Sequence, residues 1–291
     1  MDSDFAIGVD IGGTKVRAVA LDHTASVVAE HRVSTPADPD SLIRAIASAV
    51  DALGVPVGSL GIGVAGLVTI GGEVRVSPHL AHPERLDLVS RLSERFGVGV
   101  RVDNDANTAA WAEARLGAGR GVADLVVITL GTGIGAGIVC NGQLVRGAHG
   151  FAGEPGHFTI NFDGETHVTG GRGSWEMYAS GTALHRAVDG VLDAAALATA
   201  EGVVLLDAYA NAVAIGIGNV VALLDPELVV LGGGVSSVGE PLRAAVERCL
   251  PAWVFGAAER PLLRVVLAEL GERAGAIGAA LLGEGTRRAT M

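Results

Sequence analysis

The sequence predicts an α/β protein built from mixed layers of strands and helices, and three observations support this fold class. Apolar runs of strand length alternate with segments of helical periodicity along the 291 residues. Two short loops rich in glycine and threonine, at residues 12–14 and 131–133, each lie between two apolar runs. The two loops also belong to a repeat, because a shift of 119 residues places residues 9–14 on residues 128–133.

The repeat extends beyond the loops themselves. Leu21 and Asp22 fall on Cys140 and Asn141 without a gap, so both copies read as strand, loop, strand and polar turn. Identity between the copies is low, and chance similarity is the alternative explanation. We interpret the repeat as two similar β-hairpin units that begin two halves of the protein. Two such loops facing each other would grip a polyphosphate from both sides.

Individual elements follow from periodicity and from turn residues. Leu42, Ile43, Ile46 and Val50 recur at helical spacing. Helices are expected at residues 40–53, 86–96, 107–116 and 205–224 and from about residue 240, with Gly97 and Gly117 as stops. Strands are expected at residues 26–33, 59–64, 99–102, 143–145 and 228–231. No low-complexity linker divides the chain, so we expect two lobes that share an interface and a hinge.

The composition limits the kinds of ligand. The formal net charge is −11, which excludes a broad basic face for nucleic acid. Glycine contributes 43 residues, clustered in short loops, which favours site architecture over a flexible linker. An anionic ligand would therefore be bound locally, by backbone amides, helix ends or a metal ion.

Cysteines and apolar segments indicate the compartment. Cys140 and Cys249 each lie in an apolar run, so we expect two small core residues and no disulfide. Residues 125–145 carry no charge and reach the length of a membrane helix, but five glycines favour a β-hairpin. The N-terminal residues lack the pattern of a secretory signal. We expect a cytoplasmic protein with no membrane partner.

The first loop has the residues of a phosphate-binding turn. Asp10 is followed by Gly12, Gly13 and Thr14 between two apolar strands. Glycine has no side chain, so successive backbone amides can converge on an anion. The loop matches neither the lysine-terminated phosphate loop nor the dinucleotide motif. An ordinary Gly-Gly hairpin turn is the alternative.

A second cluster combines two acids with two amides. Asp103, Asn104, Asp105 and Asn107 follow a predicted strand and precede a predicted helix. Asp103 and Asn104 could simply cap that helix. One of the aspartates could instead accept the proton of a substrate hydroxyl while that hydroxyl attacks phosphorus.

Two further segments carry polar or glycine-rich loops. Glu154 and His157, framed by glycines, suit a polyol, because each hydroxyl both donates and accepts hydrogen bonds. A flexible surface loop is the alternative, and the spacing of His149, Glu154 and His157 does not match a helical metal motif. Residues 232–234 are three glycines after a strand, which lets a flat ligand or a phosphate approach the backbone.

Taken in order, these motifs resemble the ROK family of bacterial sugar kinases and related repressors, and glucose kinases in particular. The resemblance covers about residues 6–285. It implies a two-lobed, actin-like (ribonuclease H-like) duplicated ATPase fold with the active site in the interlobe cleft. It also implies a small lobe of residues 1–108, completed by a C-terminal helix at about residues 275–291, and a large lobe of residues 109–274.

The resemblance assigns roles residue by residue. Asp105 matches the catalytic base that takes the proton of the sugar 6-hydroxyl, and Asp10 matches the carboxylate that helps to hold Mg²⁺. Positions that match contacts to the sugar are Ala65, Gly66, Asn104, Asp105, Glu154, His157 and Glu176. Positions that match the ATP site are Asp10, Gly12, Gly13, Thr14, Lys15, Thr132, Gly133, Gly233 and Gly234.

One segment departs from the family pattern. Many members carry three zinc-binding cysteines where this chain has His167, Thr169 and Ser174. Hydroxyls are poor zinc ligands beside thiolates, so we expect no structural zinc. The loop would then be held by packing of Trp175 and by hydrogen bonds from Thr169 and Ser174. The loss also weakens the role that the resemblance gives to His157.

The expected function is ATP-dependent phosphorylation of glucose at the 6-hydroxyl, with Mg²⁺. Kinases for mannose, fructose, allose or an N-acetylhexosamine are the alternative, and polyphosphate is an alternative donor. A sugar-responsive repressor is disfavoured, because the first strand begins by residue 6 and leaves no room for a preceding DNA-binding domain. We expect a sugar and a nucleotide as ligands, and a homodimer or homotetramer.

Overall fold

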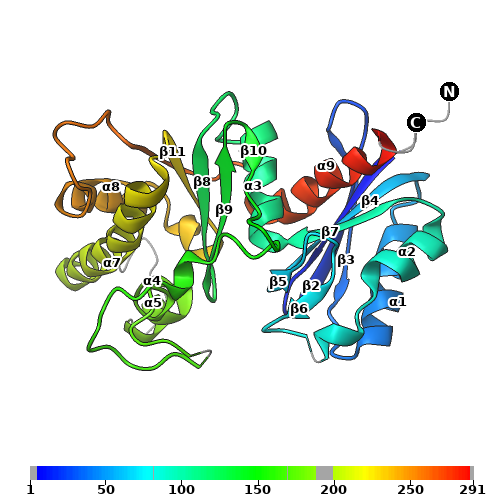
Figure 1. Ribbon diagram of the computed structural model, residues 1–291, viewed down its shortest axis with the longest axis horizontal. Helices are drawn as coiled ribbons and strands as arrows, with labels where there is room; N and C mark the ends of the chain where they lie inside the picture. The colour runs from blue at the N-terminus through cyan, green and yellow to red at the C-terminus, as the bar shows by residue number, and fades with distance from the viewer. Residues whose placement is uncertain (1–4, 81, 169, 188–198, 289–291) are drawn as a thin grey trace. The chain divides into compact units, whose positions relative to one another are not determined.

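The chain forms two compact units in the computed structural model, which describes residues 5–80, 82–168, 170–187 and 199–288. Unit 1 comprises Met1–Leu116, Leu144–Ala152 and Glu272–Met291, and unit 2 comprises Gly117–Gln143 and Gly153–Gly271 (Figure 1). The boundary expected between residues 108 and 109 falls inside helix α3 (Asp105–Leu116). That helix packs against α9 (Ala274–Arg288) within unit 1.

Unit 1 is built on a five-stranded sheet with the order β3-β2-β1-β4-β7. Its strands are β1 (Phe5–Ile11), β2 (Lys15–Leu21), β3 (Val27–Ser34), β4 (Val57–Val64) and β7 (Val100–Asn104). β1 and β2 form an antiparallel hairpin that β3 extends, whereas β4 and β7 run parallel to β1. A small hairpin of β5 (Leu67–Val68) and β6 (Val74–Val76) follows β4.

Unit 2 repeats this plan with the order β10-β9-β8-β11-β12. Its strands are β8 (Leu125–Leu130), β9 (Ile134–Cys140), β10 (Gln143–Leu144), β11 (Leu228–Gly232) and β12 (Arg264–Leu267). β8 and β9 are antiparallel, and β11 and β12 run parallel to β8, as in unit 1. The predicted duplication is therefore confirmed, with the two glycine loops as matching hairpin turns. Residues 125–145 form the expected hairpin rather than a helix.

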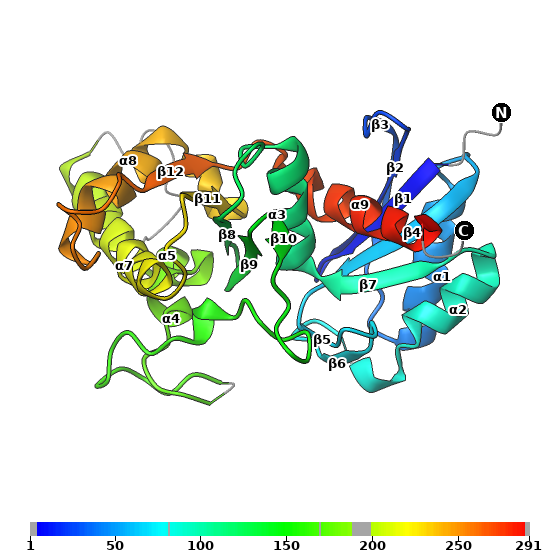
Figure 2. The same cartoon turned by 45° about the horizontal axis from the view of Figure 1, so that its top comes forward.

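Helices cover both faces of the sheet in unit 1. α1 (Pro39–Asp51) and α2 (Leu88–Phe96) lie on one face, and α3 and α9 lie on the other (Figures 1 and 2). The Asp38 carboxylate accepts a hydrogen bond from Ser41 N at 2.9 Å and so caps α1. Gly97 ends α2 with a φ of 67°, as its sequence position predicts.

Glycines bring α9 into direct contact with its neighbours. A Cβ atom on Gly61 of β4 would lie 1.7 Å from the Ala279 carbonyl oxygen. A Cβ atom on Gly8 of β1 would lie 1.8 Å from the Ala276 carbonyl oxygen. On α9 itself, a Cβ atom at Gly278 would lie 1.7 Å from the Thr108 carbonyl oxygen of α3. Backbone therefore packs on backbone, and no side chain larger than hydrogen fits at these crossings.

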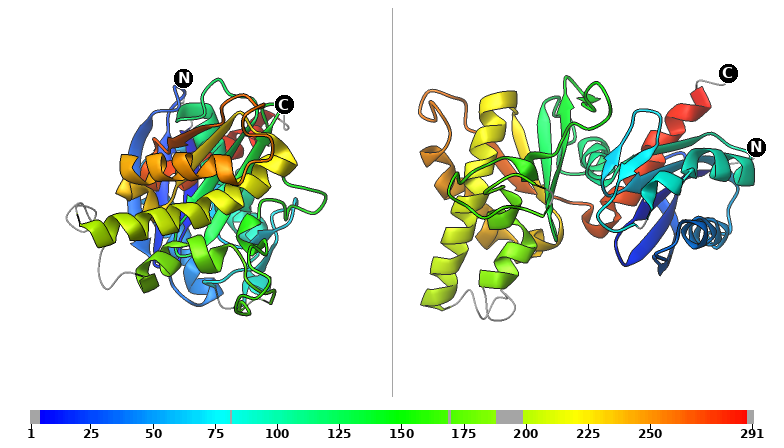
Figure 3. Two further views of the ribbon diagram at one scale, coloured as in Figure 1. Left: turned by 90° about the vertical axis from the view of Figure 1, so that its left-hand side faces the viewer. Right: turned by 60° about the horizontal axis from the view of Figure 1, so that its bottom comes forward.

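The helices of unit 2 include α7 (Ala200–Leu224) and α8 (Glu240–Cys249), which lie side by side (Figure 3). Short helices α4 (Glu176–Ala179) and α5 (Gly181–Ala187) precede them. By length and composition alone α7 could cross a membrane. Its Val213 and Ile217 are buried in the same apolar cluster as Ile128 and Val229 of the sheet, which is the environment of a core helix.

The two cysteines differ from the sequence prediction. Cys140 is exposed, because it is the last residue of β9 and leads into a turn at Asn141 and Gly142, both with positive φ. Cys249 is only partly buried at the end of α8. Both thiols are free. The prediction of two core residues was wrong for Cys140.

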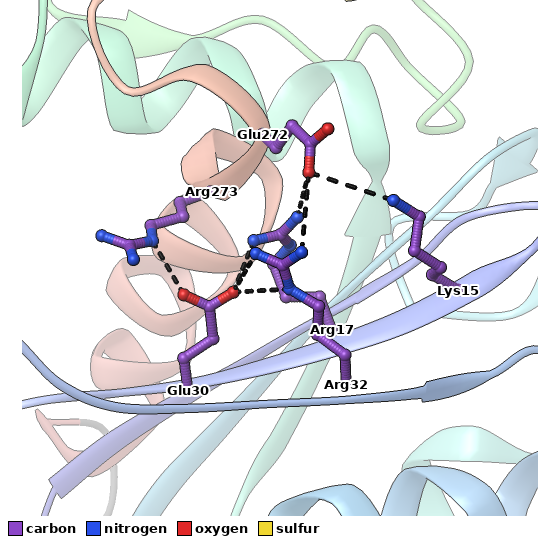
Figure 4. A network of polar contacts seen from close by, with 6 residues as sticks. All are labelled: Lys15, Arg17, Glu30, Arg32, Glu272 and Arg273. Atoms are coloured by element: carbon purple, nitrogen blue, oxygen red, sulfur yellow. Dashed lines mark hydrogen bonds and ion pairs between the residues drawn. The ribbon is translucent and has the colours of Figure 1, made fainter.

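A network of charged side chains fixes the start of α9 to the sheet of unit 1 (Figure 4). The Arg17 side chain, only 6% exposed, donates to Glu30 Oε1 at 2.6 Å and to Glu272 Oε2 at 2.5 Å. Arg273 Nε donates to Glu30 Oε2 at 2.8 Å. Because Glu272 and Arg273 directly precede α9, these contacts hold the point at which the chain enters the helix.

Substitution of α9 glycines tests the close packing. Gly278→Ala places a methyl group where the Thr108 carbonyl stands, and should lower the free energy of unfolding by about 2 kcal/mol or more. Gly285→Ala is the matched control on the same helix, because no atom lies within 4 Å of its added Cβ. It should be neutral or stabilise by up to about 1 kcal/mol. Urea unfolding of both variants measures the difference, and equal effects would contradict the packing.

Candidate functional site

Asp10 lies at the end of β1, partly buried and directly opposite Arg17 of β2. A Cβ atom on Gly275 would lie 2.8 Å from Asp10 Cγ, so the carboxylate rests against the first turn of α9. Burial, and then the nearby Asp105 carboxylate, raise the pKa of Asp10 to about 7, while Arg17 opposes the shift. Unit 1 thus holds two acidic groups close together.

The loop after Asp10 forms the turn of the hairpin between β1 and β2. Gly12 N donates to Lys15 O at 2.9 Å, which closes the hairpin turn, and Gly13, Thr14 and Lys15 are exposed. Thr35, the residue after β3, supports the loop, since its hydroxyl donates to Gly12 O at 2.7 Å. Lys15 Nζ lies 4.0 Å from Glu272 Oε2 (Figure 4). Hydrogen bonds therefore hold the loop in place at Gly12, and its residues 13–15 are exposed.

Asp105 is the first residue of α3, two residues earlier than the predicted helix start. Its Oδ1 accepts from Ala106 N at 2.9 Å. Burial raises the pKa of Asp105, against the opposing effects of backbone hydrogen bonds and of His79. A partly buried carboxylate at a helix start is positioned to accept a proton.

Asn104, a predicted sugar contact, is hydrogen-bonded to Gly66, which is another. Its Nδ2 donates to Gly66 O at 3.0 Å, and its Oδ1 accepts from Ala106 N at 2.8 Å, so it also caps α3. Gly66 has a φ of 121°, and a Cβ atom there would lie 1.9 Å from Val76 O. Ala65 precedes Gly66 in the same turn. The structure thus brings residues 65, 66, 104 and 105 together.

Asp103 is not the helix cap that the sequence allowed. Its Oδ2 accepts from Arg146 Nε at 2.7 Å, and its Oδ1 accepts from Asn104 N and from Asn107 Nδ2, each at 2.9 Å. The Asp103 side chain is only 7% exposed. A buried, fully bonded carboxylate therefore fixes the end of β7 directly before Asp105. Arg146 comes from the segment Leu144–Ala152, which returns to unit 1.

In unit 2, the second glycine loop lies beside the predicted adenosine loop. Gly131 N donates to Gly133 O at 3.0 Å, and the Gly131 carbonyl accepts from Gly181 N at 2.7 Å. Thr132 is exposed at the tip. A Cβ atom on Gly233 would lie 2.5 Å from Leu130 O, so the glycine run that begins at Gly232 packs against the strand leading into the loop.

The three predicted sugar ligands of unit 2 gather around the start of β9. Glu176 Oε2 accepts from Ile134 N at 2.8 Å. The short helix that carries His157 packs there too, because a Cβ atom on Gly156 would lie 2.5 Å from Ile134 O. His157 Nε2 lies 4.0 Å from Glu154 Oε2, and both side chains are partly exposed. Their polar atoms suit hydroxyl groups.

The segment without cysteines is held partly as predicted. Trp175 is fully buried, and its Nε1 donates to Ala212 O at 2.8 Å, as expected of a packing anchor. Ser174 Oγ is buried and, within the described part of the chain, makes no hydrogen bond, so the bond expected from its hydroxyl was wrong. Its backbone pairs instead with Thr159. Thr169 lies outside the described residues.

The side chains that could bind a metal ion suit magnesium better than zinc. Asp10 and Asp105 offer carboxylate oxygens, and Mg²⁺ usually takes one or two carboxylates together with substrate phosphates. Near Glu176, the described side chains are imidazoles and carboxylates without a thiolate. Among the described residues, no group of three His, Cys, Asp or Glu is placed to hold a metal ion. The absence of zinc stays a prediction.

Three residues beside these sites were not assigned from the sequence. Arg146 is an isolated cation in the sequence, and only the fold pairs it with Asp103. The His79 ring would meet a Cβ on Gly13 at 3.1 Å, although nothing in its local sequence indicates this. His167 contacts Glu176, and its place in the cysteine pattern was the one available signal.

The matched sheets and their paired glycine loops define a duplicated α/β fold of the sugar-kinase type. The chain belongs to the ROK family, whose family model matches residues 6–285. A glucokinase of Streptomyces coelicolor is 36% identical, over 94% of this chain and 96% of its own. An N-acetylmannosamine kinase of Citrobacter koseri is 34% identical, over 97% and 99%.

A solved structure shows the same fold. The ROK family glucokinase from Streptomyces griseus, crystallised in complex with glucose and AMPPNP, is 35% identical to this chain. The match has a TM-score of 0.86 and covers 97% of this chain and 99% of that one.

Removal of Arg146 tests the buried ion pair. Arg146→Met leaves the Asp103 carboxylate buried without its cation and should lower the free energy of unfolding by about 3 kcal/mol. Arg95→Met is the control, because its pair with Asp51 is exposed and worth less than about 1 kcal/mol. Urea unfolding compares the two variants, and a small effect at Arg146 would show that the pair contributes little.

Asp10 should make stability depend on pH. Its folded pKa of about 7 exceeds the ordinary value of 3.8, so the folded state binds the proton more tightly and loses stability as the pH rises from about 4 to about 7. Asp10→Asn removes this loss, and its Tm relative to the parent protein should be higher at pH 8 than at pH 5. Exposed Asp51→Asn is the control. A Tm difference that does not change with pH would contradict the assignment.

Proposed function

We propose that this protein transfers the γ-phosphoryl group of ATP to the 6-hydroxyl of glucose. The observation that carries the proposal is the Asp105 carboxylate, which is partly buried at the start of α3 and framed by Asn104 and Asp103. The likeness to glucokinases of two Streptomyces species supports glucose as the sugar. These contacts fix the orientation of the carboxylate that would accept the proton of a hydroxyl.

In the proposed reaction, Asp105 accepts the proton of the 6-hydroxyl as that oxygen attacks the γ-phosphorus. A bond forms between this oxygen and phosphorus while the bond from phosphorus to the β–γ bridging oxygen breaks, and ADP leaves. Burial raises the pKa of Asp105 and so makes its carboxylate a stronger base, which favours proton transfer.

Each unit offers polar groups for a sugar. In unit 1, Asn104 and the backbone of residues 65–66 supply polar groups beside Asp105. In unit 2, Glu154, His157 and Glu176 supply carboxylate and imidazole groups around the start of β9. Carboxylates accept from hydroxyls, and an imidazole can donate or accept. This set suits a ligand with several hydroxyl groups.

In each unit, a glycine loop would bind phosphate groups of ATP. The proposed phosphate contacts are Gly12, Gly13, Thr14, Lys15, Thr132 and Gly133, of which Gly13, Thr14, Lys15 and Thr132 are exposed. Gly233 and Gly234 would lie on the adenosine side, and Asp10 would hold Mg²⁺. When bound, Mg²⁺ neutralises phosphate charge. Backbone amides and one lysine then serve a triphosphate in a chain with a net charge of −11.

A second candidate changes only the sugar. The 34% identity to an N-acetylmannosamine kinase favours testing N-acetylhexosamines beside glucose, mannose, fructose and allose. A coupled ADP-release assay over this panel ranks the sugars, and glucose 6-phosphate formation with polyphosphate tests the other donor. We also infer a cytoplasmic homodimer or homotetramer without structural zinc, which light scattering and metal analysis test.

Asp105→Asn should lower kcat by about a thousandfold or more, because the amide cannot accept the proton. Glucose affinity should stay within about threefold of the parent, since the amide keeps the shape of the carboxylate. Single-turnover kinetics and calorimetric titration measure the two quantities. A kcat within tenfold of the parent would rule out Asp105 as the base.

A further inference from the structure

His167 contacts one of the proposed sugar ligands. Its Nε2 lies 3.1 Å from Glu176 Oε1, and its side chain is only 12% exposed. An ionised carboxylate can only accept hydrogen bonds, so His167 Nε2 is the donor of this contact. The imidazole thus carries its proton on the nitrogen that faces Glu176.

The other oxygen of Glu176 is bound on the opposite side. Oε2 accepts from Ile134 N at 2.8 Å, at the first residue of β9. A Cβ atom on Gly133 would lie 2.3 Å from Oε2, so the carboxylate is close against the backbone of the glycine loop. With His167 on one oxygen and the Ile134 amide on the other, the carboxylate is held at both oxygens, and each oxygen can still accept a further hydrogen bond.

His167 also contacts the second ligand. Its ring lies edge-to-face with the His157 ring, with centroids 5.6 Å apart. The segment that carries it is held by main-chain hydrogen bonds, including His167 N to Gly171 O at 2.9 Å and the pairing of Thr159 with Ser174. His167 therefore lies between His157 and Glu176 on a backbone that is itself fixed.

We infer that His167 is a positioning residue that orients Glu176 and His157 toward the sugar hydroxyls. This inference rests on the proposed function, in which both residues bind the sugar. A hydrogen bond to a charged group is worth enough to change affinity about tenfold or more. The effect should fall on the sugar, because Glu176 and His157, which His167 contacts through a hydrogen bond and a ring contact, are both proposed sugar ligands.

Two substitutions separate the hydrogen bond from the ring. His167→Phe keeps an aromatic ring against His157 and removes the donor to Glu176. His167→Gln removes the ring and keeps an amide donor near the position of Nε2. His185→Phe is the matched control, because His185 is exposed on α5 and was given no role in the site.

We expect His167→Phe to raise the glucose KM and the glucose Kd at least tenfold, with the ATP KM within about twofold of the parent. His167→Gln should restore the glucose Kd to within about threefold, and His185→Phe should match the parent. Calorimetry gives the Kd of the folded protein, and Tm values report stability separately. A His167→Phe protein that loses only Tm, or a glucose Kd that Gln does not restore, would overturn the inference.

The parent protein is assayed first, so that the two proposals fail separately. If glucose is not bound but another sugar of the panel is, glucose phosphorylation fails as the function and the His167 series is run on that sugar. If glucose is bound and His167→Phe binds it as tightly as the parent, only the inference fails. If no sugar binds, both are wrong.

Discussion

The burial of two carboxylates, Asp10 and Asp105, in unit 1 is the constraint on which the site of this unit depends. Burial and like charge both disfavour ionisation. The surrounding structure offsets part of this cost: Arg17 faces Asp10 across the hairpin, the first turn of α9 approaches it at Gly275, and the Ala106 amide donates to Asp105. A bound cation would stabilise the negative charge that remains.

Charged groups deeper in unit 1 are paired. Arg17 is shared by Glu30 and Glu272, and Asp103 bonds Arg146 together with two neighbouring amide groups. Such pairs contribute less to net stability than their Coulomb energy suggests, but each becomes unfavourable when one member is lost. In this protein the pairs hold segments in position, because each fixes a segment next to an acidic residue of the site.

Local patterns in the sequence were sufficient to predict the hairpins and most of the long helices. The repeat predicted two similar β-hairpin units, and the glycines of both loops marked their turns. Periodicity and turn residues located α1, α2, α3, α7 and α8, although Asp105 belongs to α3 and not to the loop before it, and α9 came only from the family resemblance. These features depend on neighbours in the sequence, which is why they could be found without a structure.

Contacts between distant residues were not predictable in the same way. Arg146 lies 43 positions from Asp103, and only the return of the segment Leu144–Ala152 to unit 1 brings them together. Glu176 was assigned from the motif alone, which gave no indication that Ile134 and His167 bind its two oxygens. Cys140 has apolar neighbours, but its position at a strand end exposes it. In each of these cases the outcome depends on where the fold places the residue.

The glycine contacts of α9 also bear on the order of events during synthesis. Residues 274–288 follow all of unit 2 along the chain, yet they cover the face of the first sheet that contains Gly8 and Gly61. Domains tend to fold as they leave the ribosome. Unit 2 can therefore reach its native packing first, while the glycine-containing face of the unit 1 sheet is still not covered by α9. During that interval the sheet of unit 1 has its full packing on one face only, against α1 and α2.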